Sequence, residues 1–98
     1  MPEEKKKIEL KIEVDDDMAQ GMYVNLAMVN HSPMEFTFDF IYVQPQSPKA
    51  KIRARIITSP AHTKRLLLAL EENVRRYEDR FGKIDVSKIP KDGVGTLH

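Results

Sequence analysis

Apolar residues recur at every second position in four stretches of this chain, and this alternation is what most constrains its fold. A period of two places successive side chains on opposite faces of a β-strand, so each stretch is typical of a strand with one dry and one wet face. The loops between them contain glycine, or proline with small polar residues, as strand connections do. The sequence therefore predicts antiparallel strands near residues 8–14, 22–30, 36–43 and 50–57, with these even-numbered residues inward: Ile8, Leu10, Ile12, Val14, Val24, Leu26, Met28, Phe36, Phe38, Phe40, Tyr42, Ile52, Ala54 and Ile56.

The even numbering also predicts how the strands pair. Residues that lie directly opposite each other in an antiparallel hairpin point to the same face of the sheet. If the even-numbered residues point inward on every strand, each must pair with another even-numbered residue, so the two residue numbers add up to an even value. If the hairpin between the third and fourth strands is centred near Gln46, Phe40 faces Ile52 and Asp39 faces Arg53. We therefore expect Asp39 to be a cross-strand ion-pair partner on the outer face of the sheet.

A long helix is predicted after the strands. Ser59 is a favourable N-cap, Pro60 fits the first helical position and Gly82 fits the left-handed position after the last turn, so the helix covers residues 60–81. The predicted fold class is thus α+β, a four-stranded antiparallel β-meander followed by one C-terminal α-helix that dimerises. Apolar side chains recur along one helix face at spacings of three and four, widened by Leu66. With Asn73 at its border, this face is the candidate dimer seam: Leu67, Leu70, Asn73, Val74, Tyr77 and Phe81.

Length and composition limit the classes of protein to consider. The chain has 98 residues, which suffice for one small domain, and we expect that domain at residues 8–82 between a charged tail at 1–7 and a loosely ordered tail at 83–98. The net charge of +1 provides no bulk field that would attract nucleic acid or a membrane. Cysteine is absent and no apolar run is long enough to span a membrane, so we expect a cytoplasmic protein without disulfides or membrane contact.

Residue types that carry catalysis are present, but their spacing favours structural roles. His31, Ser32 and Asp39 are the residue types of a hydrolytic triad, yet His31-Ser32 precedes a proline in a turn and no G-x-S-x-G motif is present. The three histidines are not at metal-ligand spacing, and the aspartates at 15–17 lack the calcium-loop pattern. We therefore interpret His-Ser-Pro as a turn, and we expect no catalytic residue, no metal and no cofactor, hence no enzyme.

Basic residues on the fourth predicted strand indicate a second class of function. Lys49, Lys51, Arg53 and Arg55 share one face by their spacing and could track a phosphate backbone. The same face also carries acidic residues, and no Phe or Trp is interleaved for base stacking. A charged outer face on a half-solvated sheet is the simpler interpretation, so nucleic acid is the less favoured partner.

The predicted surfaces favour self-association. Four strands at about 4.8 Å spacing make a sheet nearly 20 Å wide, whereas one helix with its side chains covers about 10 Å. Half of the phenylalanine face would stay wet unless a second copy covered it, in a homodimer or a dimer of dimers. The odd-numbered outer face would also expose an apolar patch, formed by Tyr23, Ala27, Val29, Ile41, Val43 and Ile57.

Several local motifs resemble one small prokaryotic family, the domain of unknown function with the number three-four-six-seven. The motifs are QG-x-Y-x-N-L at 20–26, HSP-x-EF at 31–36, DF at 39–40 and RLL-x-AL-x-x-N-x-x-x-YE at 65–78, and the likeness covers residues 8–82. This resemblance implies no activity. The order of four strands and a long helix is also similar to the export chaperone SecB, whose subunits pair and expose apolar grooves to clients. That second likeness is one of topology alone.

Five polar residues in or beside the strands form a candidate site on the outer face. A ligand site and a cross-strand ladder of mutually satisfied side chains are both compatible with their odd numbering, and the ladder is favoured. The leading function is a non-enzymatic, homo-oligomeric protein-binding module with a chaperone-like or adaptor role toward a protein client. A nucleic-acid accessory protein is the alternative. The outer-face residues are Asn25, Glu35, Asp39, Arg53 and Arg55.

Overall fold

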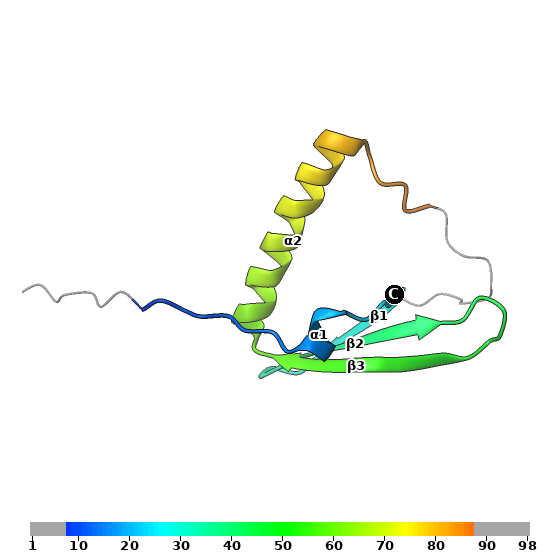
Figure 1. Cartoon of the computed structure of the whole chain (residues 1–98), viewed down its shortest axis with the longest axis horizontal. Helices are drawn as coiled ribbons and strands as arrows, with labels where there is room; N and C mark the ends of the chain where they lie inside the picture. Colours follow the sequence, from blue (N-terminus) through cyan, green and yellow to red (C-terminus); the bar gives the residue numbers. More distant parts are fainter. Residues whose placement is uncertain (1–7, 88–98) are drawn as a thin grey trace, which may run out of the picture.

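The alternating stretches form an antiparallel sheet that is followed by one long helix, so the chain is α+β (Figure 1). This architecture comes from a computed structural model, which describes residues 8–87. The strands are β1 (Leu26–His31), β2 (Phe36–Val43) and β3 (Ala50–Thr58), in the spatial order β1-β2-β3. The helices are the short α1 (Asp16–Ala19) and the long α2 (Pro60–Phe81). The predicted N-terminal tail, residues 1–7, and residues 88–98 of the predicted C-terminal tail at 83–98 lie outside the described residues.

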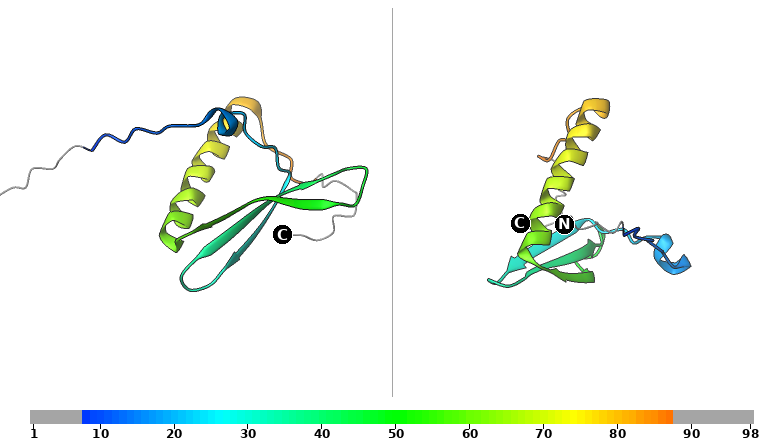
Figure 2. Two further views of the ribbon diagram at one scale, coloured as in Figure 1. Left: turned by 60° about the horizontal axis from the view of Figure 1, so that its bottom comes forward. Right: turned by 90° about the vertical axis from the view of Figure 1, so that its left-hand side faces the viewer.

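The first predicted strand is wrong for the single chain, because residues 8–14 pair with no strand and the described part of the sheet has three strands. These residues, called the arm below, extend away from the strands in Figure 1 and in the left view of Figure 2. A strand needs a neighbour for its backbone hydrogen bonds, and the alternation alone does not provide one. The aspartates expected in a turn begin the single-turn helix α1.

The first hairpin has an odd register, which contradicts the expected even one. His31 pairs with Phe36 and Leu26 pairs with Ile41. The reason is the connecting loop of residues 32–35, because an even number of loop residues makes the paired numbers sum to an odd value. Ala27 and Val29 of β1 therefore lie on the phenylalanine side of the sheet, so the predicted outer apolar patch does not form as a unit.

In the second hairpin, the phenylalanines of β2 pair with even-numbered residues of β3, as expected. Each partner lies two residues further along β3 than the sequence predicts. Phe40 pairs with Ala54, and Asp39 pairs with Arg55 in place of Arg53. A register shift follows between Phe40 and Ile41, so one residue of β3 is left as a bulge. Phe38 and Phe40 stack along β2 with ring centroids 6.3 Å apart.

The long helix has the predicted bounds and the predicted N-cap, and Gly82 ends it with a positive φ but not in the left-handed helical conformation that the sequence predicts. The Ser59 hydroxyl accepts a hydrogen bond from the His62 backbone N–H at 3.1 Å. Gly82 has φ of 101°, a value that glycine adopts without a Cβ clash. Figures 1 and 2 show α2 rising steeply from the end of β3, so it does not lie along the sheet, and it makes almost no contact with any strand.

The single chain consequently has almost no core. In residues 8–87 the buried side chains are Ile41 and Asp39, each 5% exposed, both on the central strand β2. Both lie on the face opposite the phenylalanines, with Leu26 and Met28 of β1 across from them. The phenylalanines themselves are half-buried, and α2 has no buried residue. Hydrogen bonds between strands, more than apolar packing, hold this arrangement together.

The loop of the first hairpin confirms the turn interpretation of His-Ser-Pro. The Ser32 backbone N–H donates to the Glu35 carbonyl at 2.9 Å, and the Ser32 Oγ accepts from the backbone N–H groups of Met34 and Glu35, each at 3.2 Å. One serine therefore organises the whole loop and sets the register of β1 against β2.

Ser32→Ala should destabilise the fold by about 0.5–1.5 kcal/mol, since both loop N–H groups lose their acceptor but can turn to water. Asn30→Ala is the control, because the Asn30 side chain makes no hydrogen bond to residues 8–87. Urea denaturation at a fixed chain concentration measures both variants. Equal effects of the two substitutions would contradict this account of the loop.

Candidate functional site

The predicted outer-face site contains one close ion pair, between Asp39 of β2 and Arg55 of β3. Arg55 Nε donates to Asp39 Oδ1 at 2.7 Å and Nη2 donates to Oδ2 at 3.1 Å, a two-point contact between planar groups. The Asp39 side chain is 7% exposed, whereas that of Arg55 is 58% exposed. The pair is therefore a cross-strand ladder contact of the kind favoured from the sequence, with Arg55 in the role expected for Arg53.

The ion pair changes the acidity of the carboxyl group. The hydrogen bond from Arg55 lowers the pKa of Asp39, the positive charge of Arg55 lowers it further, and partial burial opposes both. Because its pKa is lowered, the Asp39 side chain of the folded protein is ionised at neutral pH. A carboxylate already bound on both oxygens is not available as a general base.

Asn25 has a structural role at the end of the sheet. Its side-chain amide donates to the Val43 carbonyl at 3.1 Å and its Oδ1 accepts from the Val43 backbone N–H at 2.9 Å. The carboxamide thus replaces a neighbouring peptide group and satisfies the last residue of β2. These two hydrogen bonds explain why an asparagine stands just before β1.

The remaining two members of the predicted site lie apart from the ion pair. Glu35 lies in the first hairpin loop, beyond the strands. The Arg53 guanidinium lies 5.9 Å from the centroid of the Tyr42 ring, a cation–π contact. Within residues 8–87, the only hydrogen bonds that these five side chains make to one another are those between Asp39 and Arg55.

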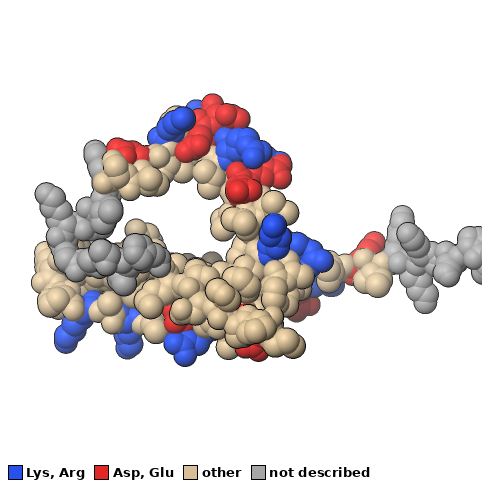
Figure 3. Space-filling model, turned by 180° about the vertical axis from the view of Figure 1, so that it is seen from behind, with Lys and Arg blue, Asp and Glu red and all other residues tan. Residues whose placement is uncertain are grey.

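Basic residues of β3 do gather around one shallow pocket at its start. Arg55 does not line this pocket; it forms the ion pair with Asp39. Seen from behind, Lys and Arg side chains project from the underside of the sheet, with a few acidic groups nearby (Figure 3). The pocket is lined by Tyr42, Gln44, Pro48, Lys49, Ala50, Lys51 and Arg53.

The helix seam is present as predicted but is uncovered. Tyr77 and Phe81 contact each other with ring centroids 4.9 Å apart. The border residue Asn73 donates from Nδ2 to the Ala69 carbonyl of its own helix at 3.0 Å. The apolar side chains of the seam are between 42% and 67% exposed: Leu67, Leu70, Val74, Tyr77 and Phe81.

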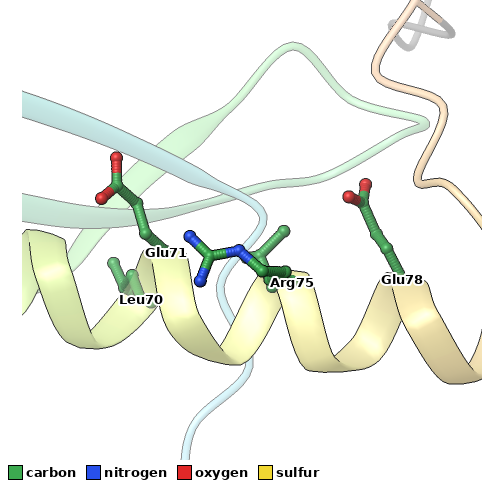
Figure 4. Close-up of a pocket in the computed structure, with 5 residues that line it drawn as sticks. Leu70, Glu71, Arg75 and Glu78 are labelled. Atoms are coloured by element: carbon green, nitrogen blue, oxygen red, sulfur yellow. The ribbon is translucent and has the colours of Figure 1, made fainter.

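Charged residues border the seam along one side. Leu70 lies beside Glu71 and Arg75, with Glu78 further along the same side of α2 (Figure 4). On the other side of the helix, Arg76 Nη2 donates to Glu72 Oε2 at 2.7 Å, an i,i+4 ion pair. A polar rim around an apolar stripe is the usual anatomy of a protein interface.

Sequence reasoning missed an apolar groove at the junction of α2 and the sheet. It joins two phenylalanines of β2 to the first turns of α2, where Arg65 Nη1 lies 3.5 Å from His62 Nδ1. The signal for it was the direct succession of β3 and α2 through Ser59 alone, which brings the helix start to the phenylalanine side. The groove is lined by Phe38, Phe40, Ile56, Thr58, His62 and Leu66.

The residues considered for catalysis are occupied elsewhere. The His31 ring stacks on Phe36 with centroids 5.3 Å apart, Ser32 Oγ accepts from loop N–H groups, and Asp39 binds Arg55. Within the described part of the chain, no three His, Cys, Asp or Glu residues are grouped so that they could hold a metal ion. His98 lies outside that part. No helix between residues 8 and 87 has both the length and the apolar character needed to cross a bilayer.

Comparison with known proteins identifies a family and nothing more specific. A family model described as "Protein of unknown function (DUF3467)" matches residues 1–86. No curated protein matches the chain. No solved structure matches it either, so the likeness to SecB has no support from these comparisons.

The ion pair predicts a pH-dependent stability. Because the folded pKa of Asp39 is lowered, the pair stabilises the fold above the unfolded pKa of about 4, and this contribution is lost as the pH falls through the lowered folded value. Arg55→Gln should lower the melting temperature at pH 7, and its difference from the parent chain should narrow below about pH 4.

Arg53→Gln is the matched control, since Arg53 is a neighbouring arginine outside the ion pair. It should change the melting temperature little at any pH. A gap for Arg55→Gln that stays constant down to pH 3 would contradict this assignment, as would equal effects of the two substitutions.

Proposed function

We propose that this chain, which belongs to the DUF3467 family of proteins of unknown function, is a non-enzymatic protein-binding module that works as a homodimer in the cytoplasm. The observation that carries the proposal is a pair of uncovered apolar surfaces in one chain. The seam of α2 and the phenylalanine face of the sheet are both solvent-accessible, because α2 stands away from the sheet (Figure 2).

The free energy gained by burying the seam is comparable to the free energy of unfolding of a small domain. Fully burying a large apolar side chain is worth about 1.5–3 kcal/mol, and the five apolar seam residues are about half exposed. Covering them would add roughly 4–8 kcal/mol per chain, against a typical total of about 5–15 kcal/mol. A chain with so few buried residues gains most of its stability from whatever covers the seam.

A second copy is the occupant that supplies matching surfaces. Its own seam and its own groove at the α2–sheet junction are apolar and equally uncovered, so one two-fold interface buries both kinds of surface on both chains. Tyr77 and Phe81 are already in contact and provide the large aromatic anchors that dominate interface energies. The Oδ1 of Asn73 accepts no hydrogen bond within residues 8–87 and can fix the register across the pair.

An adaptor or chaperone-like role is the sharper form of this proposal. Met34 is 76% exposed and lies in the loop of the first hairpin, so it is not part of the seam on α2. A flexible methionine on a protruding loop suits contact with varied apolar partners. The client in this account is a protein segment with exposed apolar side chains.

Leu70→Ala and Leu68→Ala test the seam as a matched pair. Both leucines are 53% exposed in the single chain, but they lie about 160° apart around the helix and only Leu70 belongs to the seam. Leu70→Ala should weaken dimerisation and cost about 2–5 kcal/mol, as in a packed interface, whereas Leu68→Ala should cost under about 0.5 kcal/mol. Sedimentation velocity over a dilution series measures both, and equal small effects would contradict the proposal.

A nucleic-acid accessory role is the second candidate, because three basic side chains and an aromatic ring share one pocket. Lys49, Lys51 and Arg53 line it with Tyr42, and Arg53 lies over that ring. Phosphate groups would meet the cations while a base could stack on the tyrosine.

If this second role holds, retention on single-stranded DNA should fall steeply between 50 and 200 mM salt, on the order of tenfold or more. The double variant Lys51→Ala with Arg53→Ala should flatten that dependence. Lys64→Ala with Arg65→Ala, which removes the same charge from α2, is the control and should leave it unchanged. Absence of retention at low salt would eliminate this candidate.

A further inference from the structure

The arm, residues 8–14, has the sequence of a strand without a strand's neighbour. Ile8, Leu10, Ile12 and Val14 alternate with charged residues, and these four side chains are between 61% and 89% exposed. In an isolated extended segment of this kind, the backbone N–H and C=O groups can hydrogen-bond only to water, and the apolar side chains stay exposed to it. Its alternation is explained only if it pairs with the edge of a sheet.

The two free edges of the sheet differ in how well they could accept such a strand. β3 carries a bulge and the charged residues Lys51, Arg53 and Arg55, which are features that protect an edge from pairing. β1 reads LAMVNH, with no proline, lysine, arginine or acidic residue, and pairs with β2 without a register shift. The six residues of β1 also match the length of the seven-residue arm. The accepting edge is therefore β1.

The connection between the arm and β1 directs the arm away from its own chain. It begins with α1, where the Ala19 N–H donates to the Asp15 carbonyl at 2.8 Å, and continues through Gly21 with φ of 78°. This is a long link compared with the two to five residues of a usual hairpin loop. Figure 1 and the left view of Figure 2 show the arm extending from α1 past the ends of the strands and away from them.

We propose that the arm of one copy adds to the free edge of β1 in a second copy, antiparallel to it, so that each sheet gains its fourth strand in trans. The inference rests on the proposed dimer and names a second interface within it. Exchange of identical arms satisfies the backbone of both the arm and β1, and it buries the arm's apolar side chains against the sheet without any other partner. It also gives each copy the four-stranded sheet that the alternation predicts.

A proline scan of the arm in the full chain tests whether it is an edge strand. In an added strand, alternate N–H groups point toward the neighbour and the others toward solvent, so proline is tolerated only at the latter. Leu10→Pro, Lys11→Pro, Ile12→Pro and Glu13→Pro, each compared with the alanine variant at the same position so that loss of the side chain cancels, should therefore alternate. Two of them should weaken dimerisation at least about tenfold relative to alanine, and two should change it by less than about threefold. Four similar effects, large or small, would overturn the inference.

Cross-linking identifies which edge the arm occupies and in which chain. The protein has no cysteine, so an isotopically heavy chain with Leu10→Cys can be refolded with a light chain that carries Met28→Cys, and treated with a short bismaleimide. A heavy–light product is expected. Preferential linkage to a light chain with Ile56→Cys on β3, linkage within a single chain that carries both Leu10→Cys and Met28→Cys, or no product at all would overturn the inference.

The mass of the untreated protein separates the two proposals. A dimeric mass without the arm cross-link leaves the proposed function standing and overturns the arm exchange. A monomeric mass at every concentration overturns both.

Discussion

The structure depends on one constraint, which is that α2 does not cover the sheet of its own chain. Because the helix begins one residue after β3 and rises steeply from it, its apolar seam and the phenylalanine face remain separate surfaces. Within residues 8–87, the buried side chains are those of Ile41 and Asp39. A fold with so little internal burial has little apolar stabilisation within one chain, and this shortfall is the physical basis of the proposed dimer.

Hydrogen bonds compensate locally for the missing core by fixing the registers of the sheet. Ser32 closes the first loop, the Asn25 amide satisfies the end of β2, and the Asp39–Arg55 pair joins β2 to β3. Each of these contacts lies outside the phenylalanine face. The apolar face is consequently presented in a defined arrangement, ready for a partner, while the polar groups that hold it are already satisfied.

The sequence predicted best what depends on neighbouring residues. The bounds of α2 followed from Ser59, Pro60 and Gly82, whose preferences act within one turn. The pairing of strands was harder, because the parity of the first hairpin is decided by a four-residue loop that alternation does not reveal. Arg53 and Arg55 have the same parity and charge, so the register of the second hairpin, and with it the partner of Asp39, could not be chosen from the pattern. The arm was predicted as a strand from its alternation, but a strand's neighbour can lie in another chain, which a single sequence does not encode.

The melting temperature measured over a hundredfold range of chain concentration tests the central claim most directly. If folding and association are coupled, the melting temperature rises with concentration, and light scattering gives a dimeric mass wherever the chain is folded. A melting temperature independent of concentration, together with a monomeric mass for the folded protein at micromolar concentration, would show that one chain stabilises itself and would contradict the account.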